Sequence, residues 1–179
     1  MEATISLTTR PVEVSEERSP AFHEFFEATY PAVYRAVLVV TRNRQAAEDA
    51  VANAYLRALE RWDAVSGQEK PIAWVIRVAL NDAVSSWRRI QRLLPLAAGM
   101  SILDESRVAD PDVIRAVAAL PLRQRQVVAL RILIGLDTRG TALSLGITEG
   151  AVTAHLHRAL ARLRQRLEPT PNTRNHDGR

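Results

Sequence analysis

The chain has 179 residues, which is enough for one domain of ordinary size or two small ones. Its formal net charge is +4, from 24 Lys and Arg residues against 20 Asp and Glu residues, and 47% of the residues are hydrophobic. The lack of cysteine excludes disulfides, thiolate metal sites and cysteine nucleophiles. No run of 18 apolar residues occurs, so we expect no membrane insertion, and the first 20 residues lack the apolar core of a secretory signal.

Residues 20–92 carry the apolar period of α-helices in three successive segments. The first helix is predicted to begin at Ser19-Pro20, because Pro is favoured at the first helical position. Its apolar face comprises Phe22, Phe25, Phe26, Thr29, Val33, Val37 and Val40. A second helix is predicted over 44–62 and a third, opening at Pro71, over 71–92. We expect residues 1–19 to form a disordered tail.

Residues 93–109 lose this period and contain Pro95 and Gly99, which predicts a flexible linker between two small helical domains, 20–92 and 110–168. The helical pattern returns from residue 110, where Asp110-Pro111-Asp112 is a start signal for a helix through Leu120, and it continues over 121–135, 137–145 and 148–167. Residues 169–179 are predicted to form a polar tail. In the helix that opens at Pro121, the residues expected to pack inside are Val127, Val128, Leu130, Ile132 and Leu133. No strand-like alternation appears, so the predicted fold class is all-α.

The segment from Thr138 to His157 has the spacing of a helix-turn-helix, a motif that places its second helix in a major groove. Ala142 lies where the two helices approach each other. Gly146 follows four residues later, at a turn that needs a left-handed backbone. Val152 follows six residues after that, on the inner face of the second helix, for which Thr148 is a suitable N-cap.

The second helix of this motif has an apolar side and a polar side. The residues predicted to be buried are Val152, Leu156, Ala159, Leu160, Leu163 and Leu167. The residues that face outward or flank that face, and are therefore candidates for contacts with bases or phosphates, are Thr148, Gly150, Thr153, Ala154, His155, His157, Arg158 and Arg162. An ordinary helical hairpin with a solvated basic face is the less favoured alternative.

A second candidate surface runs along the helix 71–92, opposite its apolar face. It combines a tryptophan, an amide and several arginines at steps of three or four residues: Trp74, Arg77, Asn81, Ser85, Arg88 and Arg92, with Arg89 beside them. An aromatic ring can stack on a base and arginines can hold phosphates, which suits a single strand of nucleic acid. Taken alone, the helix is equally compatible with a solvated face whose tryptophan packs on a neighbouring helix.

In their order along the chain, these motifs resemble those of extracytoplasmic-function sigma factors, a group of the sigma-70 family. The second half resembles sigma region 4 at Leu120-Pro121, Arg125, Gly135-Leu136, Gly150-Ala151-Val152 and Arg158-Ala159. The first half resembles sigma region 2 at Ala47-Glu48-Asp49, Tyr55-Leu56-Arg57-Ala58, the run from Trp74 to Asn81, and Trp87-Arg88-Arg89. The resemblance covers residues 21–168.

The resemblance implies a cytoplasmic sigma factor that directs core RNA polymerase to promoters and assists melting. Region 2 would bind the clamp helices of the largest polymerase subunit through Glu48, Asp49, Ala52, Asn53, Tyr55 and Leu56. Its third helix and the loop 66–70, including Lys70, would hold the non-template strand of the −10 element. The helix 148–162 would enter the −35 major groove. Further implied partners are the flap of the second-largest subunit and an anti-sigma factor.

We expect neither an enzyme nor a cofactor or metal site, because the sequence shows no paired catalytic carboxylates, no nucleophile with a base, no metal-ligand spacing and no phosphate-cradling loop. Two alternatives stay open. One is a helix-turn-helix regulator that binds duplex DNA without polymerase. The other is a degenerate sigma-like interaction module, suggested by Ala52, Asn53, Thr153 and His155, where the family usually carries other residues.

Overall fold

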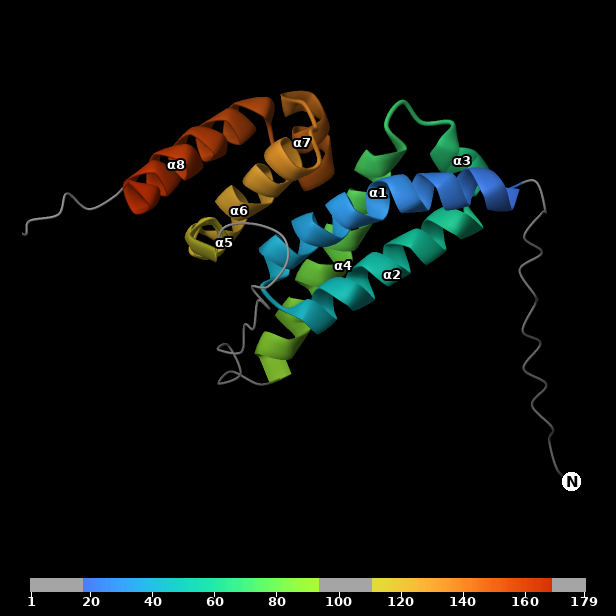
Figure 1. Ribbon diagram of the computed structural model, residues 1–179, viewed down its shortest axis with the longest axis horizontal. Coiled ribbons are helices and arrows are strands. Elements are labelled where there is room, and N and C mark those ends of the chain that lie inside the picture. The colour runs from blue at the N-terminus through green and yellow to red at the C-terminus, as the bar shows by residue number, and fades with distance from the viewer. Residues whose placement is uncertain (1–17, 94–110, 169–179) are drawn as a thin grey trace, which may run out of the picture.

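The structure, a computed structural model, describes residues 18–93 and 111–168, and these two ranges contain helices and no strand (Figure 1). The all-α prediction is confirmed. The predicted tails and linker lie outside the described residues, apart from Arg18 and Ser19, which begin the first helix, and Leu93, which ends the helix before the linker. None of the described helices is long and apolar enough to cross a membrane.

The first half is a bundle of three long helices, α1 (Arg18–Thr41), α2 (Arg44–Glu60) and α4 (Pro71–Leu93), with the short helix α3 (Trp62–Ser66) between the last two. The prediction that the second helix extends to residue 62 is wrong. The helix ends at Glu60, because Arg61 has a non-helical backbone (φ −119°, ψ 27°) and separates α2 from α3. This break turns Trp62 into the core, where its ring centroid lies 5.3 Å from that of Phe22 and 5.1 Å from that of Phe25.

The second half contains α5 (Pro111–Ala118), α6 (Leu122–Val128), the π-helical turn η1 (Ala129–Leu133), α7 (Thr138–Leu145) and α8 (Glu149–Leu167). The expectation that Ile132 and Leu133 pack inside is wrong, since they are 61% and 38% exposed. The amide of Ile134 bonds to the carbonyl of Ala129 at 3.2 Å, five residues back. This wide turn shifts the buried face, so that Ala129 and Leu130 point inward and Ile132 and Leu133 point outward.

The buried side of α8 is also shorter than predicted. Val152 and Ala159 are buried, but Leu160 and Leu167 are 44% and 40% exposed. The three helices that cover α8, which are α5, α6 and α7, have eight residues or fewer, whereas α8 has 19. The apolar side of α8 therefore extends beyond its cover.

The two halves share one hydrophobic core, which the sequence did not predict. Ala129, Leu130 and Leu136 of the second half are buried in the same cluster as Val33 and Val37 of α1. α1 lies against α5, α6 and η1, and α4 contacts α7 (Figure 1).

Arg125 ties these halves together through its buried guanidinium, which is 8% exposed. Its Nε donates to the carbonyl of Val40, at the end of α1 (3.2 Å), and its Nη1 donates to the carbonyls of Ala118 (2.8 Å) and Leu120 (3.0 Å) at the end of α5. The last carbonyls of a helix have no helical donor and carry partial negative charge, so they suit a buried cation. Burial, with Arg42 nearby, lowers the pKa of Arg125 to about 10, which leaves it charged at neutral pH.

We expect Arg125→Met to lower the free energy of unfolding by about 2–3 kcal/mol, because it removes a charged donor from three buried or half-buried carbonyls. Arg123→Met is the matched control: Arg123 is exposed and its Nη1 donates to Gln126 Oε1 (3.2 Å), so its loss should cost less than about 0.5 kcal/mol. Urea denaturation measures both. Equal midpoints for the two variants would contradict this role of Arg125.

Candidate nucleic-acid interface

The turn between α7 and α8 has the geometry that the sequence predicted. Gly146 adopts a left-handed backbone (φ 62°, ψ 42°) and its amide donates to the carbonyl of Ala142. The amide of Ile147 donates to the same carbonyl at 3.1 Å. The chain leaves α7 through these two bonds and enters α8 after only three residues, and Gly adopts the required φ without steric cost.

The start of α8 is fixed from both sides. Thr148 is extended (φ −77°, ψ 155°), and its Oγ1 accepts a hydrogen bond from the amide of Ala151 at 3.1 Å. Val152 is 1% exposed and packs in a cluster with Val127 and Ala142. The N-cap and this buried contact hold the first turns of α8 rigidly against α6 and α7.

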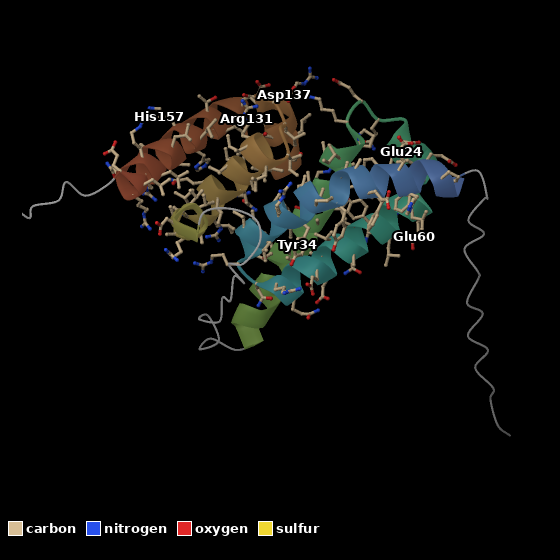
Figure 2. All side chains as sticks on the ribbon, viewed as in Figure 1. Glu24, Tyr34, Glu60, Arg131, Asp137 and His157 are labelled. Carbon is tan, nitrogen blue, oxygen red and sulfur yellow. The ribbon has the colours of Figure 1, made fainter. Side chains whose placement is uncertain are left out.

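The outer side of α8 is free of contacts from the rest of the described chain at most predicted positions. The exposed members of the predicted set are Thr148, Gly150, Thr153, Ala154, His157, Arg158 and Arg162. A Cβ added at Gly150 would meet nothing within 4 Å, so a close neighbour such as a DNA backbone has room there. His157 is labelled on the outer side of α8 in Figure 2. Arg158 Nε donates to the carbonyl of Ala154 at 3.1 Å, which holds the guanidinium along the helix.

His155 differs from the other members of this set, because it is only half-exposed. Its Nδ1 is buried, and no hydrogen-bond partner for it occurs among the described residues. Burial lowers the pKa of His155 below its ordinary value, and the charges of Arg158 and Arg123 lower it further. At neutral pH the ring is therefore uncharged, and it lies at the flank of the outer face rather than at its centre.

The polar stripe of α4 lies opposite a buried face that includes Val75, Ile76, Ala79, Leu80 and Ala83. Arg77, Asn81 and Ser85 are exposed, whereas Lys70 and Trp74 are half-buried. Trp74 also packs on the edge of the shared core, so part of its ring supports the bundle. α4 continues through Arg88, Arg89 and Arg92, whose side chains lie outside those that the structure describes.

The first residues of this stripe meet α7. Lys70 Nζ lies 3.0 Å from Asp137 Oδ2, and the other carboxylate oxygen, Oδ1, accepts from the amide of Gly140 at 2.6 Å. The Gly140 amide and then Lys70 hold the pKa of Asp137 below its ordinary value. A groove of about 340 Å³ follows this contact, with Trp74 and Arg77 on one side and Arg139 and Leu143 on the other. Asp137, Arg139 and Leu143 were not predicted, because the sequence carries no sign that the halves touch.

The predicted polymerase-binding residues are all on α2, and most of them form its exposed side. Asp49, Ala52 and Asn53 are exposed, and Leu56 is 58% exposed. Glu48 is half-buried and accepts from Arg44 Nε at 2.8 Å, and Asp49 accepts from the Gln45 amide at 2.8 Å. α2 thus presents the apolar side chain of Leu56 and, two turns earlier, the carboxylate of Asp49 to solvent.

Tyr55 is the exception, and the expectation that it contacts a partner does not fit its position. It is 4% exposed, and its ring centroid lies 4.9 Å from that of Phe26. Thr29 Oγ1 donates to the carbonyl of Phe25 (2.6 Å), so in its 2.8 Å contact with Tyr55 Oη the tyrosine is the donor. Burial raises the pKa of Tyr55 to about 12, which keeps that proton in place. Tyr55 fixes α1 on α2 and positions the exposed side of α2.

These features define a class of all-helical protein that carries a helix-turn-helix and a second helix with an aromatic and basic stripe, two candidate nucleic-acid-binding surfaces. Among the described residues, no group of three or more His, Asp or Glu side chains could hold a metal ion. The sequence matches the family Sigma-70 region 2 over residues 25–93 and the family Sigma-70, region 4 over residues 112–163.

Relatives give the same result over most of the chain. The RNA polymerase sigma-E factor of Streptomyces avermitilis is 30% identical over 152 residues, which cover 82% of this chain and 85% of the relative. The sigma-E factor of Streptomyces antibioticus is 33% identical over 130 residues, covering 68% and 71%. The chain belongs to the sigma-70 family, as an RNA polymerase sigma factor of the extracytoplasmic-function group.

Solved structures agree on the fold. The sigma factor RpoE of Bartonella quintana, solved in complex with the anti-sigma factor NepR, matches with a TM-score of 0.71 at 21% identity, covering 82% of this chain and 96% of that one. CnrH, solved with the cytosolic domain of CnrY, matches with a TM-score of 0.56 at 18% identity, covering 82% and 87%.

Gly146 and Gly150 make a matched pair for a stability measurement, because a Cβ added at either position would meet no atom within 4 Å. Gly146→Ala should lower the free energy of unfolding by about 1–2 kcal/mol, because only its left-handed φ, and no neighbouring atom, opposes a side chain. Gly150→Ala should raise it by up to about 1 kcal/mol, since Gly150 is helical and its surroundings are equally open. Thermal or urea denaturation measures the change in the free energy of unfolding for each variant. A change in the same direction for both would contradict a left-handed Gly146 and a helical Gly150.

Proposed function

We propose that the chain delivers core RNA polymerase to promoters by reading the −35 duplex with α8 and holding the −10 single strand with α4. The observation that carries this proposal is the exposed outer side of α8, from Gly150 to Arg162, held rigid by the Gly146 turn and the Thr148 cap. A rigid helix with a free polar side suits a major groove. The stripe of α4 adds an aromatic ring and cations, which suit unstacked bases and phosphates.

The two halves of the chain bind different promoter elements in this proposal. Residues 20–92 serve as region 2, which binds polymerase and the −10 element, and residues 110–168 serve as region 4, which binds the −35 element. The exposed side of α2 docks on the clamp helices of the largest polymerase subunit, and region 4 contacts the flap of the second-largest subunit. The protein acts in the cytoplasm and performs no bond chemistry of its own.

An anti-sigma factor is a further partner in this proposal. RpoE, which shares the fold, was solved in complex with the anti-sigma factor NepR, and CnrH, which also shares it, was solved with the cytosolic domain of CnrY. The exposed apolar residues Leu133, Leu143 and Leu160 give the second half surface that a protein partner can cover.

Run-off transcription with purified core polymerase tests the function directly. The complete chain should direct initiation at discrete genomic start sites, and core enzyme alone should not. A gel shift with duplex promoter DNA, with and without core, separates this function from that of a stand-alone regulator. Tight binding without core and no specific transcripts would favour the regulator.

We expect Arg158→Ala to weaken binding of the holoenzyme to −35 duplex DNA and to reduce the slope of log affinity against log salt by about one, as for the loss of one phosphate contact. Arg35→Ala is a closely matched control. Arg35 is also exposed on a helix, and its Nε also donates to a carbonyl four residues back, that of Pro31 at 3.0 Å. If both variants change the slope equally, Arg158 has no special part in DNA binding.

Leu56→Asp should weaken binding to core polymerase by about tenfold or more, because burying a leucine side chain is worth about 1.5–3 kcal/mol. The side chain is 58% exposed, so the fold should tolerate the change. Ala64→Asp, at an exposed position of α3 in the same half, provides the control. Fluorescence anisotropy of the labelled chain with core enzyme measures both affinities. If Leu56→Asp and the control bind core polymerase with equal affinity, the exposed side of α2 is not part of the polymerase interface.

A further inference from the structure

The groove between the start of α4 and α7 contains two arginines that serve no purpose in the fold. Arg77 of α4 and Arg139 of α7 both line this groove, and both side chains are exposed. Among the residues that the structure describes, neither guanidinium has a hydrogen-bond or ion-pair partner. Two guanidiniums that line one space without a carboxylate bonded to either indicate a place for an anion.

The charges that line the groove leave it positive. Lys70 Nζ lies 3.0 Å from Asp137 Oδ2, so these two side chains neutralise each other. Glu69, on the loop before α4, is the other carboxylate in the lining, and it is exposed. Arg77 and Arg139 outweigh it, so the lining has three cations against two carboxylates. An anion that enters the groove therefore meets a net attraction, weakened by Glu69.

An aromatic ring lies in the same lining. Trp74 is half-buried: part of its ring packs on the edge of the shared core, and the ring also lines the groove. Arg77 follows three residues later, which places it next to Trp74 on one side of α4. A flat group stacked on the indole would therefore carry its substituents close to a guanidinium. This pairing suits a base joined to phosphates.

The size of the groove suits one nucleotide. Its volume of about 340 Å³ lies at the lower end of the range of roughly 300–1,000 Å³ that is typical of small-molecule sites. Three lining residues, Ala73, Gly140 and Ser144, have small side chains or none, so a ligand can come close to both helices. Because the lining comes from both halves, a ligand of this size would touch α4 and α7 together.

We propose that this groove binds a free nucleoside diphosphate or triphosphate, with its base stacked on Trp74 and its phosphates held by Arg77 and Arg139. Stacking tolerates any base, and guanidiniums bond phosphate oxygens in pairs, so the ligand is defined by a base and a polyphosphate together. One part of the inference rests on the proposed function. Trp74 and Arg77 also belong to the −10 surface, so a bound nucleotide excludes the strand from the start of α4.

Isothermal titration calorimetry of the complete chain tests the site, with ADP as the probe and with adenosine and inorganic pyrophosphate as its separate parts. ADP should bind at least about tenfold more tightly than either part, because only ADP uses the ring and the guanidiniums at once. Equal affinities for ADP and pyrophosphate would overturn the stacking on Trp74. The absence of ADP binding up to about 1 mM would overturn the site as a whole.

Tryptophan fluorescence provides an independent signature of stacking. ADP should quench the emission of the complete chain, pyrophosphate should not, and Trp74→Phe should remove most of the ADP quench. Phe keeps a ring on the edge of the core, and Trp62, which is 7% exposed in the first half, remains as an internal reference. A quench that survives in Trp74→Phe would mean that the base binds elsewhere, which would overturn the proposal.

Arg139→Ala removes a guanidinium that the proposed DNA surfaces do not include. It should weaken ADP binding by about fivefold to tenfold, while the affinity for a fluorescein-labelled single strand stays within about twofold when nucleotide is absent. Arg164→Ala is the matched control, because Arg164 is also an exposed arginine on a helix but lies outside the groove. Equal ADP affinities for the two variants would overturn the role of Arg139.

Glu69→Gln tests the charge of the groove in the opposite direction. It removes the exposed carboxylate and keeps the size of the side chain, so ADP should bind about twofold to threefold more tightly. Glu60→Gln, at an exposed position at the end of α2 and outside the groove, is the control and should leave ADP affinity unchanged. Weaker binding of ADP to Glu69→Gln would contradict attraction of the phosphates by the groove.

Competition separates this inference from the proposed function. Saturating ADP should weaken binding of a single strand of about 12 nucleotides by about fivefold or more, whereas adenosine should not. Unchanged strand affinity with ADP bound would overturn the exclusion of the strand. Should the complete chain fail in promoter-directed transcription without nucleotide, the proposed function is wrong, while calorimetry and fluorescence still decide whether the groove binds a nucleotide.

Discussion

A buried arginine bonded to main-chain carbonyls supports both the fold and the placement of the two surfaces. Arg125 lies where α1 and α5 end, and it bonds to carbonyls from both ends. Leaving such carbonyls buried without donors would cost as much as the loss of hydrogen bonds. Because the donor comes from α6, the start of region 4 is fixed relative to the end of α1. The residues that follow, from Ala129 to Leu136, then reach the core of the first half.

Much of the local structure was predictable from sequence because the responsible interactions lie within a few residues of one another. Gly146 at the left-handed turn, Thr148 at the N-cap and Val152 beneath α8 act over six residues, and each was found where its pattern placed it. The buried side of α4 follows the helical period just as closely. Such features depend on backbone conformation and on one adjacent helix, which a single sequence encodes.

The features that the sequence did not predict depend on contacts between residues far apart in the chain. Ile132 and Leu133 satisfy a helical period, but the π-turn at η1 shifts that period so that Ala129 and Leu130 face α1 instead. Tyr55 was assigned to the polymerase interface from the family resemblance, yet its partners in the structure are Thr29 and the phenylalanines of α1. The pairing of Lys70 with Asp137 spans 67 residues and two halves with separate patterns. No periodicity within either segment contains that information.

The two candidate surfaces differ in the way their charges are held, and this difference fits the two forms of DNA. On α8, the rigid turn and cap fix the helix, and among the described residues Arg158 donates to the Ala154 carbonyl of the same helix. Its other N–H donors remain available to a ligand. A fixed helix suits a duplex groove, whose shape is already set before binding. At the start of α4, Lys70 pairs with the Asp137 carboxylate and Trp74 is partly packed, so under the proposed function a strand would compete with these contacts. A single strand has no fixed shape to match, and an aromatic ring with nearby cations can adapt to its unstacked bases and phosphates. Under the proposed function, the chain therefore combines a rigid helix for the duplex groove with adaptable side chains for the single strand.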